Sequence, residues 1–306
     1  MTRTTRLLAL LIATGAAFSG TGVALAQAPL TLATPAEVPA VVAIARPSAE
    51  EVDLARNSFA KFARKADRKT QDVLKKYPNL IEVRPPGPNS AILPSLAPGF
   101  VAKHQNNLAV AKQGDAELLF MGDSITDFWR NPDGNYAGKP VMDKHFSQWK
   151  IANYGIAGDT TQGVLYRLED GEGTGINPRA IMLMIGTNNT ARNSAAEIAE
   201  GVGAVVLSLQ RHYPRAQILL LAIFPRGRAA NDPIRGTLAE INKSISRLDD
   251  GKQVHYLDIG AGFLEADGSI SPTVMSDALH PTTKGYEIWA QAVEQPLTKL
   301  MAAGGK

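Results

Sequence analysis

The stretch AELLFMGDSIT, Ala116 to Thr126, predicts the fold of this chain. Its first half contains a short apolar run, Leu118 to Met121, typical of a strand buried on both faces of a sheet. Gly122 then permits a sharp turn, and the Asp-Ser pair that follows favours a helix start. Ser124 is therefore expected at the carboxyl edge of a parallel sheet, where open α/β sheets bind ligands. Taken alone, the stretch is explained equally well by a serine that only caps a helix.

Apolar runs and amphipathic stretches alternate from here to the C-terminus. Ser194 and Glu197 are spaced as a capping box, and Pro233 suits the first turn of a helix. The alternation predicts an α/β fold: a three-layer, doubly wound sandwich around a five-stranded parallel sheet in the flavodoxin-like order 2-1-3-4-5, plus an N-terminal helical extension. We expect strands at residues 116–121, 150–155, 180–185, 217–223 and 254–258, and helices at about 160–170, 194–212, 233–248 and 283–301.

The composition is that of a chain with a packed core. Of 306 residues, 44% are hydrophobic and 20% are charged, which is typical of globular proteins rather than disordered ones. A formal charge of +3 is too small to argue for nucleic acid as a partner. The absence of cysteine excludes disulfides, thiolate chemistry and zinc knuckles.

Residues 1–26 have the pattern of a secretory signal peptide. Arg3 and Arg6 precede an apolar stretch, Leu7 to Phe18, and the small-residue sequence ending at Ala26 offers a cleavage site. Polar and glycine residues interrupt the apolar run too early for a membrane anchor, which needs about 20 apolar residues. We therefore expect cleavage after Ala26 and a secreted or periplasmic protein.

The region before the sheet divides into two parts. Residues 27–50 are rich in Ala and Pro and are expected to form a flexible spacer. Residues 51–101 read as a helical extension and loop, with one apolar face from about Glu50 to Tyr77 and many Lys and Arg elsewhere. The basic surface has two explanations: weak contact with an anionic cell-envelope surface, or the solvated outer face of a helix packed on the main domain. We favour the second. The catalytic domain is then expected at residues 102–306.

Glycine and asparagine residues follow two of the other predicted strands. Gly158 can bring a bare backbone N–H close to a ligand, and the amide of Asn188 would point two donors over the sheet edge. Taken singly, each is explained more simply as an ordinary loop residue.

The segment Asp277 to His280 lies downstream of the last strand. A spacing of three lets Asp277 orient the His280 ring and leave its other nitrogen free as a base. A surface histidine beside a solvated aspartate is the alternative. The remaining histidines have no metal-binding spacing, so neither a metal nor an organic cofactor is expected: His104, His145, His212 and His255.

Together these residues meet the requirements of nucleophilic catalysis. A serine hydroxyl needs a base, the base needs a carboxylate to hold its tautomer, and the oxyanion needs fixed N–H donors. Ser124, His280 and Asp277 supply the first set, and the Ser124 and Gly158 amides with the Asn188 side chain supply the second.

Four short blocks occur in a familiar order: GDSIT (122–126), GIAGD (155–159), GTNN (186–189) and DALH (277–280). In order and spacing they resemble the blocks of the SGNH hydrolases, also called GDSL esterases/lipases, over roughly Leu108 to Leu300. The longer strings NYGIAGDTTQGVLYRLEDGE and MIGTNNT resemble the branch that contains the platelet-activating factor acetylhydrolase catalytic subunits. The resemblance implies Ser124 as nucleophile, Gly158 and Asn188 as oxyanion donors, and Asp277 with His280 completing a triad.

Two other frameworks fit less well. The turn at Ser124 lacks the second glycine of the G-x-S-x-G elbow of α/β-hydrolases. The glycine-rich segment 171–175 follows a helix rather than a strand, which argues against dinucleotide binding.

The prediction is a serine esterase that cleaves carboxylic esters through an acyl-enzyme. Ile125 and Leu279 adjoin the nucleophile and the base, which favours a short acyl group, acetyl above all, with O-acetylated carbohydrate as one candidate for the alcohol side. Alternatives are an O-acyltransferase with the same triad, a lipid acylhydrolase and a non-catalytic wall-binding module. The residues expected to line the substrate pocket are Asp123, Ile125, Thr187 and Leu279.

Overall fold

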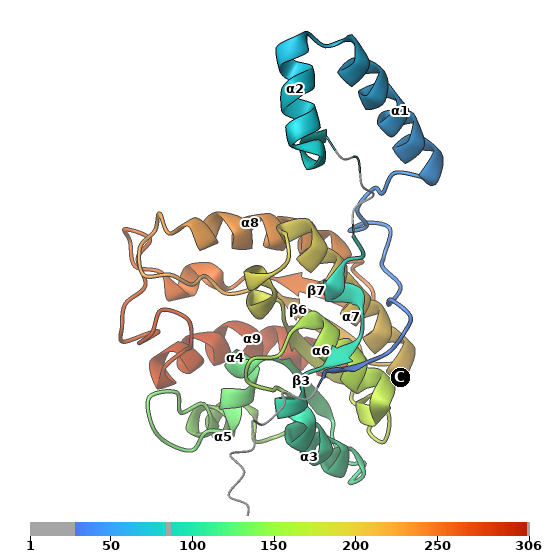
Figure 1. The fold of residues 1–306 in the computed structure, drawn as a ribbon. Helices are drawn as coiled ribbons and strands as arrows, with labels where there is room; N and C mark the ends of the chain where they lie inside the picture. The colour runs from blue at the N-terminus through green and yellow to red at the C-terminus, as the bar shows by residue number, and fades with distance from the viewer. Residues whose placement is uncertain (1–27, 82, 84–86, 305–306) are drawn as a thin grey trace, which may run out of the picture.

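A five-stranded parallel sheet forms the centre of the molecule (Figure 1). The computed structural model describes residues 28–81, 83 and 87–304. The strand order, β4-β3-β5-β6-β7, is the predicted order 2-1-3-4-5, and each strand lies within about two residues of its predicted bounds. The strands are β3 (Leu118–Gly122), β4 (Ile151–Asn153), β5 (Ala180–Met184), β6 (Gln217–Leu221) and β7 (Val254–Leu257).

Helices cover both faces of the sheet, as predicted. Successive side chains of β3 alternate between the two faces: Leu119 and Met121 pack in one core, and Leu118 and Phe120 in the other. The first core lies under α6 (Thr161–Arg167), α7 (Ala195–His212) and α8 (Pro233–Ile245), and the second lies under α5 (Lys139–Phe146) and α9 (Thr283–Ala303).

Several short elements lack a clear sequence signal and were not predicted. The longest are α3 (Val101–Ala111), just before β3, and α5 (Lys139–Phe146). The others are the pair β1 (Leu30–Thr31) and β2 (Ser95–Leu96), the single-turn helix α4 (Ser124–Asp127), and the turns η1 (Pro78–Ile81), η2 (Ser90–Ile92), η3 (Pro98–Phe100), η4 (Phe128–Arg130), η6 (Thr187–Ala191) and η8 (Gly260–Phe263). The turns η5 (Leu168–Glu172) and η7 (Ser246–Leu248) fall at the ends of the helices expected over residues 160–170 and 233–248.

The segment predicted as a flexible spacer lies along the body of the molecule instead. β1 pairs with β2, and Val42 is buried in the core against α7. A Cβ atom at Gly203 of α7 would lie 2.6 Å from a methyl carbon of Val42, so this glycine makes room for the segment. The Ala/Pro-rich composition therefore reflects an extended chain that packs on a helix.

The predicted basic helix forms two helices, α1 (Ala49–Lys65) and α2 (Arg68–Lys76). The break falls at Asp67, whose side chain accepts a hydrogen bond from the Thr70 amide and starts α2. The expectation that this region packs on the main domain is wrong. Figure 1 shows α1 and α2 packed on each other and standing away from the body, and Phe62 is 63% exposed.

Glu200 of α7 holds the two ends of this helical hairpin together. Its buried carboxylate accepts a bidentate pair from Arg46 at 2.8 and 2.6 Å, and further bonds from the Ile44 amide and from Asn89. Arg46 precedes the hairpin and Asn89 follows it. Burial alone would raise the pKa of Glu200, but these donors lower it. The hairpin is therefore anchored at its base on α7.

The predicted signal peptide lies outside the described residues. Within the part of the chain that the structure does describe, no helix is long and apolar enough to cross a membrane.

A buried ionic cluster lies behind the loop that follows β4. The Arg167 guanidinium is fully buried and pairs with Asp159 at 2.9 Å and with Glu172. Glu172 also contacts His104 Nδ1 at 2.8 Å and accepts a hydrogen bond from Asn107 at 3.0 Å, both on α3. These contacts tie α3 to the loop that contains Asp159.

We predict that Arg167→Met destabilises the protein by about 3–5 kcal/mol, because it leaves two buried carboxylates without their cation. Urea unfolding monitored by circular dichroism gives the free energy. As a matched control, Arg215→Met on the exposed surface should change it by less than about 0.5 kcal/mol. Equal effects of the two substitutions on the free energy of unfolding would show that pairing in the cluster does not stabilise the fold.

Candidate active site

Ser124 lies where β3 turns into α4, and Gly122 makes that turn possible. A Cβ atom at Gly122 would lie 2.2 Å from Thr126 Oγ1 and 2.4 Å from the Met184 carbonyl oxygen, so no larger residue fits. The carboxylate of Asp123 accepts a hydrogen bond from the Ile125 amide and caps the helix. Ser124 is thus the first residue of α4, at the carboxyl edge of the central strand.

The loop before α9 brings an imidazole to this serine. Ser124 Oγ lies 2.8 Å from His280 Nε2, and His280 Nδ1 lies 2.6 Å from Asp277 Oδ2. The other oxygen of Asp277 accepts bonds from the Leu279 and His280 amides. Ala278 adopts φ +60°, and its carbonyl accepts a bond from the Gly227 amide, which fixes this strained turn.

Asp277 is held in its charged form. Partial burial raises the pKa of this carboxyl. The hydrogen bonds from the His280 amide and ring and from the Leu279 amide outweigh that effect and lower the pKa to about 2. A carboxylate at Oδ2 requires the hydrogen on His280 Nδ1, which leaves Nε2 as an acceptor toward Ser124.

Two aromatic residues surround the imidazole. The Phe128 and Tyr136 ring centroids lie 5.1 and 5.3 Å from that of His280, and the two rings stack on each other. Tyr136 also donates its hydroxyl hydrogen to Asp277 Oδ2 at 3.1 Å. Sequence reasoning missed both residues, because nothing in their local sequence marks contact with a loop about 140 residues later.

The three N–H groups expected to serve as oxyanion donors each have hydrogen-bonding capacity left over. The Ser124 amide has no partner within its helix because it begins α4. Gly158 adopts φ +89°, and among the described residues its amide donates to no acceptor. Asn188 donates one amide hydrogen to the Asp159 carbonyl at 2.7 Å, which keeps its side chain beside the Gly158 loop and leaves its second hydrogen available.

Asp127 of α4 holds the loop that contains Gly158. Its carboxylate accepts a hydrogen bond from the Ala157 amide at 2.9 Å and pairs with Lys103 of α3 at 2.6 Å and with Arg130. Burial raises the pKa of Asp127, but Lys103 and Arg130 lower it overall. The loop beside the serine is therefore fixed by charges from three elements.

The four residues expected to line the substrate pocket differ in their exposure. Asp123 and Thr187 are buried, and Ile125 packs in the core under α5 and α9, so its side chain does not crowd the serine. Leu279 is half-buried beside His280. A residue that was not predicted, Phe100 of η3, lies over the loop: its Cζ would be 3.2 Å from a Cβ atom at Gly158.

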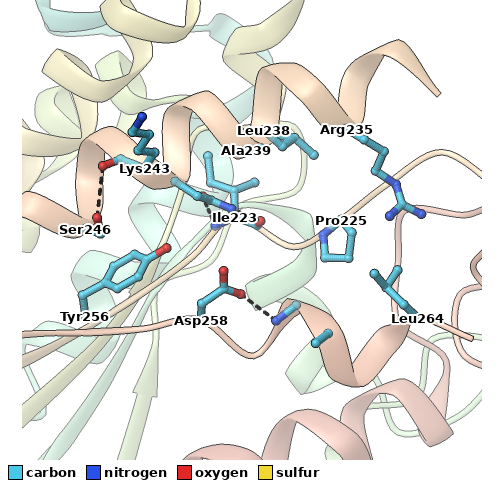
Figure 2. A pocket seen from close by; sticks show the side chains of 13 residues that line it. Ile223, Pro225, Arg235, Leu238, Ala239, Lys243, Ser246, Tyr256, Asp258 and Leu264 are labelled. Carbon is cyan, nitrogen blue, oxygen red and sulfur yellow. Dashed lines mark hydrogen bonds between the residues drawn. The ribbon is translucent and has the colours of Figure 1, made fainter. Parts of the chain in front are cut away.

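A separate cavity of about 460 Å³ lies between α8 and the edge strand β7 (Figure 2). Tyr256 and Asp258 point into it, and Leu238 and Ile223 form its apolar side. No predicted site residue lines this cavity. In the described part of the chain no group of three metal-ligating side chains is gathered that could hold an ion.

The comparisons with known proteins identify the family of this chain. The model of the GDSL-like Lipase/Acylhydrolase family matches residues 120–288, which spans the serine and the histidine, so the chain belongs to this family. It is therefore an enzyme that hydrolyses ester bonds.

Two relatives are named as acetylhydrolases. The chain is 33% identical over 203 residues to the platelet-activating factor acetylhydrolase IB subunit alpha2 of Rattus norvegicus, covering 66% of this chain and 85% of the relative. It is 31% identical over 204 residues to the alpha1 subunit of Homo sapiens, covering 66% and 84%. A solved GDSL-like lipase from Bacteroides thetaiotaomicron shares the fold, with a TM-score of 0.50, 19% identity and coverage of 65% and 97%.

We predict that Tyr136→Phe lowers kcat of ester hydrolysis by about three- to tenfold. The variant loses one hydrogen bond to Asp277 Oδ2, the oxygen that holds the His280 ring, while the aromatic ring and its stacking are retained. Steady-state kinetics on a soluble ester measures the loss. Tyr77→Phe on α2 is the matched control, and equal kcat for both variants would contradict the role of the hydroxyl.

We also predict that Asp123→Asn gains stability relative to wild type as the pH rises from about 5 to about 8. Burial raises the pKa of the Asp123 carboxyl to about 7, well above its value in the unfolded chain. The folded state thus holds a proton that the unfolded state releases, and the associated stability is lost as the pH rises through about 7. Asparagine has no such proton. Denaturant midpoints over a pH series test this, with the exposed Asp72→Asn as control. A pH-independent difference between Asp123→Asn and wild type would refute it.

Proposed function

We propose that this chain is a serine esterase that works through an acyl-enzyme, with Ser124, His280 and Asp277 as its triad. The observation that carries the proposal is the continuous hydrogen-bonded line from Ser124 Oγ through the His280 ring to Asp277, at 2.8 and 2.6 Å. In such a line the imidazole takes the hydroxyl proton while the carboxylate stabilises the cation that forms.

The first half of the reaction forms the acyl-enzyme. His280 Nε2 removes the Ser124 proton as Oγ attacks the ester carbonyl carbon. The tetrahedral intermediate collapses as the carbon–oxygen bond to the alcohol breaks, and the alcohol leaves with the proton held on His280. In the second half, water gives its proton to His280 and attacks the acyl carbon, and the acid departs from Ser124, which regains its proton.

The charge of each tetrahedral intermediate falls on the former carbonyl oxygen. The Ser124 and Gly158 amides and the Asn188 side chain are the donors we assign to it. They are already fixed in place, by α4, by the Asp127 contacts and by the Asp159 carbonyl respectively. Donors that need no rearrangement are typically worth 100- to 1000-fold in rate each.

For the substrate we propose a short acyl group, acetyl above all. The two relatives described above are named acetylhydrolases, and Phe100 and Leu279 flank the Gly158 loop and His280, which limits the space beside them. The signal-like N-terminus leads us to propose that the enzyme works outside the cytoplasm, where O-acetylated carbohydrate is a candidate for the alcohol side. Transfer of the acyl group to a sugar hydroxyl is the second candidate activity, since the same acyl-enzyme serves both.

A panel of acetyl, butyryl and octanoyl esters of one chromophore tests the proposal on the chain that begins at Gln27. We expect the acetyl ester to turn over fastest and Ser124→Ala to lower kcat by about 10⁴-fold or more. Fastest turnover of the octanoyl ester would refute the short-acyl proposal, and unchanged activity of Ser124→Ala would refute the triad. An acetylated sugar that accumulates when a sugar acceptor is present would favour the transferase.

A further inference from the structure

The helical hairpin of α1 and α2 presents an apolar face that the described chain leaves uncovered. Phe59 and Phe62 lie three residues apart on α1, and Val73 and Tyr77 lie four apart at the end of α2, so each pair shares one side of its helix. Phe59, Phe62, Val73 and Tyr77 are 47%, 63%, 43% and 51% exposed. Exposed large aromatic side chains grouped in this way are typical of a surface that binds another protein, a membrane or a ligand.

The part of the hairpin that contains these side chains is rich in positive charge. Between Phe59 and Leu80 there are seven basic residues against two acidic ones, a net charge of +5, whereas the whole chain carries +3. The rest of the molecule is therefore net negative. None of these cations forms an ion pair with a described residue; they are Lys61, Arg64, Lys65, Arg68, Lys69, Lys75 and Lys76.

The charge decides which partner fits. Over residues 49–76 the hairpin has eight basic and five acidic residues, a net charge of +3. Pairing its face with the same face of a second copy would therefore bring like charges together, which is repulsive. An anionic lipid surface is complementary in both respects, because acyl chains take up the aromatic rings and phosphates take up the cations. The polar Lys/Arg side and aromatic apolar side are those of helices that lie in a membrane interface.

The hairpin is joined to the body at its base. Glu200 is fully buried in α7 and binds Arg46, just before α1, and Asn89, in the segment that follows the hairpin. A buried carboxylate in α7 would be costly without these partners, so these contacts are a built part of the fold. Figure 1 shows the two helices standing away from the body, and the exposed fractions of Phe59 and Phe62 show that the described chain leaves these side chains uncovered.

We propose that the α1–α2 hairpin binds the surface of an anionic lipid bilayer, with the rings of Phe59, Phe62 and Tyr77 inserted at the level of the headgroups. This binding is independent of the esterase reaction.

Vesicle cosedimentation with the protein that begins at Gln27 tests the proposal. Phosphatidylcholine vesicles with roughly 30% phosphatidylglycerol should bind at least tenfold more strongly than phosphatidylcholine alone. Because the Debye length shortens as salt is added, about 0.5 M NaCl should remove most of this difference. Equal binding to both kinds of vesicle, or no binding to either, would overturn the proposal.

Three double variants assign the surface. Phe59→Ser with Phe62→Ser, and Lys75→Gln with Lys76→Gln, should each weaken binding to the anionic vesicles at least fivefold. Lys112→Gln with Lys252→Gln removes the same charge from the body and should leave binding within twofold. Hydrolysis of a soluble acetyl ester, measured in parallel, should be equal in all three, which separates this proposal from the proposed esterase activity.

Sedimentation velocity without lipid tests whether a second copy of this chain covers the hairpin face instead. A monomer at all concentrations supports the lipid surface. A dimer that is lost in the Phe59→Ser, Phe62→Ser variant, together with absent vesicle binding, would assign the face to a second copy and overturn the proposal.

Discussion

The chain turns at Gly122 in a space that admits no side chain, and the site depends on this constraint. β3 lies between β4 and β5, and its last residue is enclosed by Thr126 of α4 and by the Met184 carbonyl of β5. Because the turn is this tight, α4 starts at the sheet edge and its first residue, Ser124, faces the loops after β4 and β5. A wider turn would move the hydroxyl away from His280 and from the Gly158 loop together.

Most of the fold could be predicted because its signals are local. The apolar runs of β3, β5 and β6 each end at a glycine or a proline. The spacing of Ser194 and Glu197 marks the start of α7, where the structure has both halves of the capping box. The one helix expected over residues 50–77 was an error of the same local kind. An apolar period of three and four persists through residues 66–67, but Asp67 ends one helix and caps the next.

The site could be predicted only in part, for a physical reason. Ser124, Gly158, Asn188, Asp277 and His280 each follow a recognisable turn at the end of a strand or before a helix, and the topology of a parallel sheet gathers those turns at one edge. The residues that fix them have no such signal. Tyr136 meets Asp277 across 141 residues. Contacts between such distant residues depend on the packed structure rather than on any local pattern. Ile125 shows the converse error: adjacency to Ser124 in sequence suggested a pocket residue, but the helical turn directs its side chain into the core.

The two ends of the molecule use charge in opposite ways. Around the site, charges are paired: Arg167 with Asp159 and Glu172, all fully buried, and the largely buried Asp127 with the partly exposed Lys103. Breaking a desolvated pair leaves an uncompensated buried charge, so these contacts hold the Gly158 loop in a single arrangement. The seven Lys and Arg residues between Phe59 and Leu80 are exposed and form no ion pair with a described residue. Because they stay hydrated, their free-energy cost is small, and they respond to an external field and to salt. Rigid, paired charge suits a group that must hold a transition state, and solvated charge suits a surface that must bind and release. The base of the hairpin combines the two, since a buried carboxylate, Glu200, pairs there with a partly exposed cation, Arg46.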